Sequence, residues 1–501
     1  MSDFYFFPLL PRLNLQPIII IMKTSSLSFL FLLFLSPASF SQSYTAAIEP
    51  CPCMVKYDAR LVARCGYLVA PENRQRPQGK SVKVPFVYLR KPEADASGNV
   101  TLFSTGGPGY STIAGFDSIR YESDFFKFGG LILFNQRGAK RSQPCLDCAG
   151  IDEAIKRSYK ENLSRDSLVM EVVTRCRKGF ESQGIDLSAY NTIESAEDIN
   201  DLRKTLGIDS LNLLGISYSG GLMLTVARNH PEAVRLLLLN SPLPGYVHFE
   251  EDGLLNFNEA LNQVFTNCET DSARKDLYGD LRRRFHTYFS GLSGKAFTLS
   301  YTEPSGTETL RIRYTRNELL DAVSSRLNPG QLASLPFVMN ELIAGHHEPY
   351  IKEVLDGHFQ GNSKLSYGMR LSIYCSEQIA YADPALIKKQ DAVVPWLAGY
   401  PFNNVNHAIC SCWKVKPEAR EAKTPVYSRV PVLVSGGDVD PDCRPFYNRL
   451  IKRTMPNAQL LIIHNRGHLS GFYVNGEDFG SMFLADPYKK IVSRSKDVIV
   501  E

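Results

Sequence analysis

Two serines stand close together in the stretch LNLLGISYSGG, which lies between an apolar run and a helical pattern. A serine at a sharp turn from a buried strand into a helix can act as a nucleophile, because the turn exposes its hydroxyl above the sheet. Such a turn requires small residues two positions before and two positions after the serine. Gly215 and Ser219 flank Ser217, and Ser217 and Gly221 flank Ser219, so this rule allows either serine. The apolar run LNLLGI ends directly before Ser217, which favours Ser217 as the nucleophile.

A serine nucleophile needs a general base, and the base needs an acidic residue to orient it. The run VPVLVSGGDVDP carries Asp438 and Asp440, and the run AQLLIIHNRGH carries His464 and His468. Groups beyond the carboxyl ends of parallel strands can converge on the turn that holds Ser217. Asp440 and His468 are favoured because each lies in a loop past its strand, whereas Asp438 is close enough to its strand to cap or pair locally. Each residue alone would pass for an ordinary loop aspartate or buried histidine.

An oxyanion formed during attack on a carbonyl must also be stabilised, and backbone N–H groups can do this. The stretch FSTGGPGYST follows a predicted strand and can direct the N–H group of Gly107 toward the nucleophile. The second donor would be the N–H group of Tyr218, the residue after Ser217. A simple glycine turn is the alternative interpretation of this stretch.

The elements that would position these residues can be read from seven short apolar runs. Most do not alternate between apolar and polar residues, which is typical of strands buried on both faces. Helical patterns lie between them; SAEDINDLRKTL, for example, begins with Ser195 as a potential N-cap. We therefore predict an α/β fold around a mostly parallel sheet. The seven predicted strands are residues 82–90, 99–105, 131–136, 211–216, 234–241, 430–436 and 458–464.

The alternation of strands and helices breaks off in the second half of the chain, where helical patterns such as FNEALNQVF and NELLDAVSSRL dominate. No long flexible linker is visible there, which favours a mainly helical cap inserted into the core over a separate helical domain. The predicted division is a hydrolase-like core over residues 42–242, the cap over 243–424, and the rest of the core over 425–501.

The first 41 residues have the pattern of a secretory signal peptide, with Met22 as an alternative start. Lys23 precedes the apolar run LSFLFLLFL, and small residues follow it. This run is shorter than the roughly 20 residues that span a bilayer, so we expect no stable membrane insertion after cleavage. An uncleaved anchor is the alternative. The eleven cysteines fit export to the periplasm or beyond, where disulfides form. Their odd number leaves at least one thiol unpaired.

Composition narrows the possible partners. A net charge of +4 over 501 residues, with no run rich in Lys and Arg, makes nucleic acid an unexpected partner. One C-x-x-C pair, Cys145 and Cys148, has no second pair at zinc-finger spacing, so no metal site is predicted. No cofactor is implied either.

These motifs together resemble the serine aminopeptidases of the α/β-hydrolase class, namely the prolyl and tripeptidyl aminopeptidases with a conserved C-terminal segment. The resemblance runs from about Cys65 to about residue 472. It implies an α/β-hydrolase fold, a catalytic triad of Ser217, Asp440 and His468, and an oxyanion hole at Gly107 and Tyr218. The matching segments are, in order, TGGPG (105–109), LFNQRGAKRSQP (133–144), LLGISYSGG (213–221), SIYCSEQIAY (372–381), SGGDVDP (435–441) and NRGH (465–468).

The chain departs from the pattern of these aminopeptidases at four places. Thr105 replaces a histidine, Asn135 replaces an aspartate, Ser219 replaces a glycine, and Asp442-Cys443-Arg444 replaces an uncharged Thr-Pro segment. These changes remove no member of the triad, and they bear on substrate and efficiency more than on the fold. The resemblance also implies an acidic residue for the substrate's free amine, at Glu377.

The sequence thus predicts an exported serine aminopeptidase that acts on peptides with free N-termini. A carboxylic ester hydrolase with the same triad is the first alternative, because an acyl-enzyme mechanism cleaves esters more easily than amides. A non-catalytic binding protein on this fold is the second, and it would fail to react with an active-site fluorophosphonate. The sequence leaves the residue preference, the disulfide pairing and the oligomeric state open.

Overall fold

The computed structural model describes residues 44–304 and 306–501. The predicted signal sequence lies outside these residues. Among the described residues, no helix has both the length and the apolarity needed to cross a bilayer.

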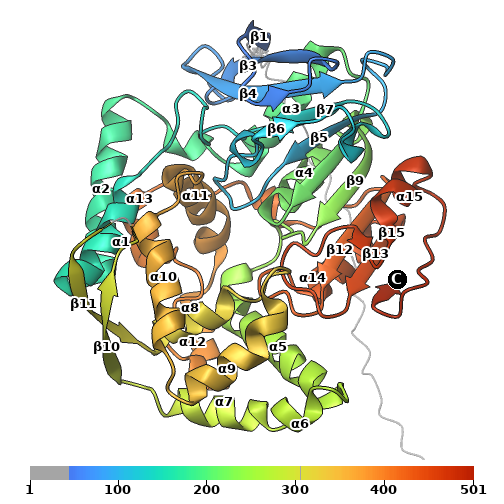
Figure 1. Ribbon diagram of the computed structural model, residues 1–501. Coiled ribbons are helices and arrows are strands. Elements are labelled where there is room, and N and C mark those ends of the chain that lie inside the picture. The colour runs from blue at the N-terminus through green and yellow to red at the C-terminus, as the bar shows by residue number, and fades with distance from the viewer. Residues whose placement is uncertain (1–43, 305) are drawn as a thin grey trace, which may run out of the picture. The chain divides into compact units, whose positions relative to one another are not determined.

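A ten-stranded sheet forms the centre of the described chain (Figure 1). Its strands lie in the order β1 (Ala47–Pro50), β3 (Val62–Pro71), β4 (Ser81–Arg90), β7 (Leu131–Phe134), β5 (Val100–Ser104), β8 (Leu211–Ile216), β9 (Val234–Asn240), β12 (Val432–Gly437), β13 (Ala458–Ile463) and β16 (Val498–Val500). The strands from β7 to β13 are parallel, and the outer pairs are antiparallel. All seven predicted strands are present, and the predicted mostly parallel α/β fold is confirmed.

Helices cover the sheet because their apolar faces pack against the buried strands. In the core these are α1 (Gly150–Glu161), α2 (Arg165–Ser182), α3 (Thr192–Leu206), α4 (Tyr218–Asn229), α14 (Pro445–Thr454) and α15 (Phe479–Ala485). The expectation that Ser195 caps α3 is wrong. The helix starts one turn earlier, because the side chain of Asn191 accepts a hydrogen bond from Glu194 N and acts as the N-cap.

Between β9 and β12 the chain forms the predicted helical insertion, which also contains a β-hairpin. Its elements are α5 (Phe249–Thr270), α6 (Lys275–Tyr278), α7 (Leu281–Ser290), β10 (Ala296–Thr302), β11 (Thr309–Thr315), α8 (Arg316–Ser324), α9 (Leu335–Ile343), α10 (Glu348–Gln360), α11 (Tyr367–Ile373), α12 (Pro384–Val393) and α13 (His407–Trp413).

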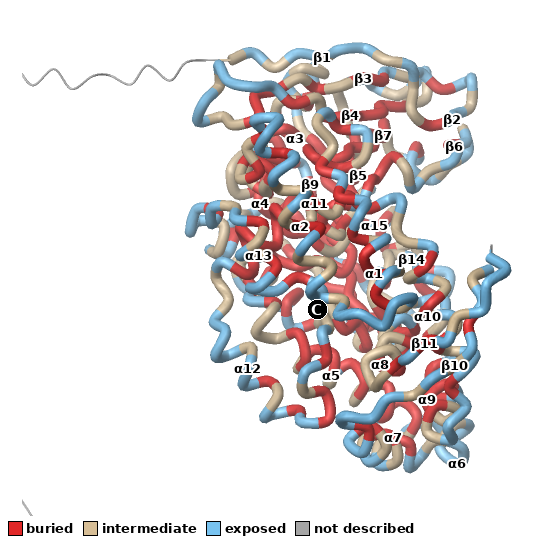
Figure 2. The backbone as a smooth tube through the Cα atoms, turned by 90° about the vertical axis from the view of Figure 1, so that its left-hand side faces the viewer, coloured by how far each residue is buried: buried red, intermediate tan, exposed pale blue. Residues whose placement is uncertain are grey.

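The insertion has a hydrophobic core of its own, which includes Phe257, Phe285 and Leu355. Helices α11 and α13 behave differently, since Met369 and Trp413 join the hydrophobic core of the sheet. Figure 2 shows how buried segments run through both the sheet strands and the inserted helices. The insertion is therefore anchored to the sheet by its last third.

Three disulfides connect Cys53 with Cys65, Cys148 with Cys176, and Cys375 with Cys410. The C-x-x-C pair is therefore split, because Cys148 pairs with a cysteine of α2 and Cys145 has a free thiol. The other free thiols among the described residues are Cys51, Cys268, Cys412 and Cys443.

Candidate active site

Ser217 lies at the turn between β8 and α4, with φ 55° and ψ −125°. A non-glycine residue with positive φ is uncommon, and such strained positions gather at functional sites. The turn is tight: a Cβ atom added to Gly215 would come within 2.6 Å of the carbonyl oxygen of Ser219. The Ser217 N–H group donates to the carbonyl of Asn240 on the next strand at 3.0 Å, which fixes the turn against the sheet.

Ser219 has a different environment, although the local sequence rule allowed either serine. Its side chain is fully buried, and its Oγ accepts from Ile216 N at 2.8 Å and donates to the carbonyl of Ser104 at 2.6 Å. The hydroxyl thus connects the ends of β8 and β5. Ser217, by contrast, lines a cavity, and its role as nucleophile stays a prediction.

Asp440 and His468 lie together beyond β12 and β13. Nδ1 of His468 lies 2.9 Å from Oδ2 and 3.1 Å from Oδ1 of Asp440, whose side chain is buried. Oδ1 also accepts from the N–H groups of Asp442 and Cys443, at 2.9 and 2.8 Å. A proton on Nδ1 leaves Nε2 as the acceptor, which is the tautomer that a general base needs.

The charge of this pair is set by two opposing effects. Burial favours the neutral form of each group, but the attraction between the carboxylate and the imidazolium outweighs it. The pKa of His468 is therefore raised above its ordinary value, and the pKa of Asp440 is lowered. Asp438, the other candidate acid, pairs with the exposed His464 at 2.7 Å and so takes part in a separate contact.

A cavity of about 470 Å³ brings the predicted residues together. Ser217, Tyr218, His468 and Gly107 all line it, while Asp440 lies behind His468. The remaining wall residues come from the core loops and from the insertion: Thr105, Gly106, Tyr110, Ile216, Leu243, Phe249, Arg370, Tyr374, Phe402, Asn403, Asp442, Cys443 and Leu469.

The glycine loop after β5 lies directly against the turn of Ser217. A Cβ atom on Gly106 would come within 2.5 Å of the carbonyl of Ile216 and 2.9 Å of Ser217 Cβ, so only glycine allows this approach. Gly107 has φ +117°, and its N–H group has no hydrogen-bond partner among residues 44–304 and 306–501. Tyr218 is the first residue of α4, where N–H groups have no acceptor within the helix. Both N–H groups are thus available to an oxyanion.

One of the departures noted in the sequence, Asn135, holds the segment after the glycine loop in place through its side chain. Asn135, beyond β7, accepts from Ile113 N at 3.0 Å and donates through Nδ2 to Ser111 Oγ at 2.9 Å and to the carbonyl of Lys140 at 2.7 Å. An ionised aspartate at this position could not donate those two bonds. Thr105 N donates to Thr112 Oγ1 at 2.9 Å, which closes the loop on itself.

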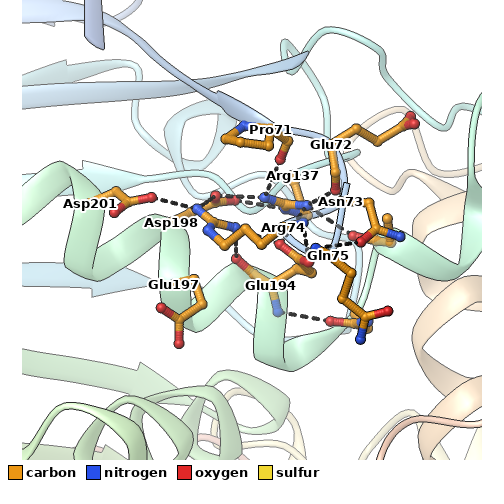
Figure 3. A network of polar contacts seen from close by, with 12 residues as sticks. Pro71, Glu72, Asn73, Arg74, Gln75, Arg137, Glu194, Glu197, Asp198 and Asp201 are labelled. Carbon is orange, nitrogen blue, oxygen red and sulfur yellow. Dashed lines mark hydrogen bonds and ion pairs between the residues drawn. The ribbon is translucent and has the colours of Figure 1, made fainter. Parts of the chain in front are cut away.

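Arg137, two residues after Asn135, fixes the loop beyond β7 through a network of buried polar contacts (Figure 3). Its guanidinium is fully buried and binds Asp198 through two bonds, at 2.7 and 2.8 Å. It also donates to the carbonyls of Pro71, Glu72 and Ala189. In the same network Arg74 binds Glu194, Asp198 and Asp201, so that α3 is tied to the loops after β3 and β7.

Glu377 lies in a π-helical turn after α11 and is buried. Its two oxygens accept from Thr192 N and Thr192 Oγ1, both at 2.7 Å, and Thr192 Oγ1 lies 2.6 Å from the hydroxyl of Tyr218. Burial and the nearby Glu377 raise the pKa of Glu418 to about 9, and burial also raises the pKa of Glu377. Glu377 lines a small cavity next to the catalytic one and supports Tyr218 from behind. Its role in binding the substrate amine stays a prediction.

No role was predicted from the sequence for Arg370, Cys443 or Asp442, which all line the same cavity as Ser217. Arg370 of α11 donates to the carbonyl of Gly107 at 2.5 Å and so links the insertion to the oxyanion loop. Cys443 is buried beside His468, and burial raises the pKa of its thiol to about 12. For Asp442, the sequence offered one signal: the charged segment Asp442-Cys443-Arg444 stands where the aminopeptidases have an uncharged one.

Residues 130–473 match the family model of the α/β-hydrolase fold, and the chain belongs to this family. It is 22% identical over 408 residues to the serine protease Hip1 of Mycobacterium tuberculosis, covering 76% of each chain. It is 24% identical over 209 residues to a tripeptidyl aminopeptidase of Streptomyces lividans, covering 39% of this chain and 38% of the relative. A putative hydrolase of Escherichia coli, YuaR, is 25% identical over 215 residues, covering 41% of this chain and 40% of the relative. With these relatives, the fold and the geometry define a serine hydrolase.

Proposed function

We propose that this chain is an exported serine aminopeptidase, which releases N-terminal residues or short peptides from peptides with a free amine. One observation carries the proposal: Ser217, held at positive φ, lines the same cavity as His468, which is bonded to the buried Asp440. The names of two relatives, a serine protease and a tripeptidyl aminopeptidase, support a peptide substrate.

The proposed mechanism gives each of these groups a role. His468 Nε2 takes the proton of Ser217 as Oγ attacks the scissile carbonyl, and Asp440 stabilises the imidazolium that forms. The N–H groups of Gly107 and Tyr218 hold the oxyanion of the tetrahedral intermediate. His468 then donates its proton to the leaving amine, and a water molecule, activated by the same histidine, hydrolyses the acyl-enzyme. Removing one oxyanion donor costs an enzyme of this kind about 10²–10³ in kcat.

The space around the triad supports a peptide substrate. A second cavity of about 710 Å³ borders the catalytic one and shares Tyr110, Arg370 and Asn403 with it. Its walls come from the core helices α1 and α2 and from the insertion. The two cavities together offer room for several residues of an extended peptide.

Export is the second part of the proposal. Three disulfides in the described residues support a location in an oxidising compartment, where such bonds persist. A fractionation experiment on the native host, with and without residues 1–41, tests this part directly. Retention of the full-length protein in the cytoplasm would contradict it.

The catalytic part is tested by comparing the wild type with Ser217→Ala on a matched panel. The panel contains prolyl, alanyl and tripeptidyl anilides with free amines, their N-acetylated twins and a simple ester. Cleavage of the free-amine substrates alone, abolished in Ser217→Ala, is the expected result. Equal cleavage of the blocked twins, or cleavage of the ester only, would assign the protein to the ester hydrolases instead. Failure of the wild type to react with a fluorophosphonate probe would support a non-catalytic binding protein.

A further inference from the structure

Asp442 is the one acidic side chain among the described residues that line the catalytic cavity. It is half-buried, and its carboxylate has no hydrogen-bond or ion-pair partner within residues 44–304 and 306–501. Carboxylates that are withdrawn from water normally gain a cation or several hydrogen bonds in compensation. The fold supplies neither to Asp442.

The backbone around Asp442 is fixed without any help from its side chain. The N–H groups of Asp442 and Cys443 donate to Oδ1 of Asp440, and Nη1 of Arg444 donates to the carbonyls of Asp438 and Asp440 at 2.8 and 3.2 Å. The loop beyond β12 therefore keeps its course when only the carboxylate of Asp442 changes. A structural role in the loop does not explain an acid here.

The positive groups near Asp442 are already occupied. His468 is paired with Asp440, and Arg370 directs its guanidinium to the carbonyl of Gly107, to Asn403 Oδ1 at 3.2 Å and across the ring of Tyr374 at 4.5 Å. Burial raises the pKa of Asp442, against the opposing effect of these two cations. The carboxylate thus lies close to positive charge without an ion pair of its own.

We propose that Asp442 is a specificity-determining residue that binds an alkylammonium group of the substrate, in the first place the free α-amine of a peptide. The proposal rests on the proposed aminopeptidase function, and it assigns the amine contact to the cavity wall beside His468. The aromatic side chains of Phe249, Tyr374 and Phe402 line the same cavity. They offer apolar surface to the carbon skeleton next to the amine, and the rings of Phe249 and Phe402 could also contact the cation.

The same chemistry could come from a lysine side chain, so the test contains two pairs of substrates. The first pair is an alanyl anilide and its N-acetylated twin, and the second is N-acetyl-lysyl anilide and N-acetyl-norleucyl anilide. Asp442→Asn keeps the shape and removes the charge. We expect it to lower the preference for the charged member of one pair about 10- to 100-fold, the range for losing one charge-assisted hydrogen bond.

The substrate pair whose preference falls in Asp442→Asn shows whether Asp442 binds the α-amine or a lysine side chain. Unchanged preferences in both pairs would overturn the proposal. Asp276→Asn is the matched control, because Asp276 is an exposed aspartate of α6 and its loss changes the net charge equally. Glu377→Gln is the comparison variant. Because Glu377 acts through Thr192 and Tyr218, this variant should slow cleavage of all four substrates alike. If instead Glu377→Gln lost the preference for the free amine and Asp442→Asn kept it, the amine site would be Glu377.

A second measurement separates this inference from the proposed function. Alaninamide and N-acetylalaninamide are compared as inhibitors of p-nitrophenyl acetate hydrolysis, which requires the triad but no peptidase activity. The wild type should bind alaninamide more tightly than its acetylated twin, and Asp442→Asn should remove most of that difference. If anilides are not cleaved, the proposed function fails while this assay still tests Asp442. Equal inhibition by both amides in the wild type would contradict the ammonium site, and equal fluorophosphonate labelling of both proteins verifies that the variant is folded.

Discussion

Replacing Arg137 by methionine should strongly destabilise the protein. The guanidinium and its partner Asp198 are both fully buried, and the variant leaves the carboxylate with Arg74 as its cation, at 2.7 Å. It also leaves the carbonyls of Pro71, Glu72 and Ala189 without the bonds they accept from Arg137. A buried polar group that loses its partner costs about 1–3 kcal/mol, so the loss of these bonds amounts to several kcal/mol even though Arg74 still compensates the charge of Asp198.

The assay is urea unfolding at pH 7, followed by tryptophan fluorescence and circular dichroism. Arg157→Met is the matched control, because Arg157 pairs with Glu161 on the surface of α1 and both side chains are about half exposed. An exposed pair one helical turn apart contributes about 0.3–0.5 kcal/mol. The free energy of unfolding of Arg137→Met should therefore fall by several kcal/mol more than that of the control. A loss in Arg137→Met within about 0.5 kcal/mol of the control would refute the reasoning on buried pairs.

The pH dependence adds a second check on the same variant. Burial alone would raise the pKa of Asp198, but Arg137 and Arg74 hold it below its ordinary value. A group with a depressed pKa contributes stability above its unfolded pKa of about 3.9, and this contribution is lost as the pH falls through its folded pKa. The difference in stability between wild type and Arg137→Met should therefore shrink in that acidic range. A difference that stays constant down to acid would show that lost packing, and not lost charge, destabilises the variant.

Three further predictions concern the triad and its surroundings. Ser219→Ala should retain fluorophosphonate labelling. Its free energy of unfolding in urea should fall by about 1–3 kcal/mol, because the variant leaves buried backbone groups unpaired. Ser217→Ala should show the reverse, with labelling lost and stability kept. Asp440→Asn should lower kcat about 10⁴-fold without unfolding, as measured by steady-state kinetics and circular dichroism, since the imidazole loses the acceptor that sets its tautomer. Because His468 must be neutral to act as a base and its pKa is raised, the acidic limb of kcat/KM should lie above pH 6.5, the ordinary histidine value; a limb below that pH would contradict the pairing with Asp440.

The central strands could be predicted because the sheet buries both of their faces. The runs around β8 and β12 are short, mostly apolar and followed by small residues or glycines, and their length favours a buried strand over a helix. The outer strand β3 could not be found this way. It is half-exposed along its first residues and carries polar side chains there, so no continuous apolar run marks it.

The residues of the candidate site were likewise predictable only in part. Ser217, Asp440 and His468 follow directly from the ends of strands, where parallel topology brings loops together whatever the loops contain. The positions of Glu377 and Asp442 depend instead on how the insertion packs and how one loop turns. Glu377 lies behind Tyr218, bonded to Thr192 of α3, a contact across 185 residues of sequence that no local pattern encodes. Asp442 faces the cavity because Asp440 binds the backbone beside it.

The departures from the aminopeptidase pattern argue for a working site when their contacts are considered. A chain that had lost catalysis would have no reason to keep the oxyanion loop in place after changing its supports. Here Asn135 donates two bonds that an aspartate could not, and the hydroxyl of Ser219 ties the nucleophile turn to the end of β5. The side chains of Asn135 and Ser219 thus each supply hydrogen bonds that hold the loop or the turn beside Ser217. For Asn135 and Ser219 these contacts fit a working site better than the non-catalytic alternative, whose test remains the fluorophosphonate probe.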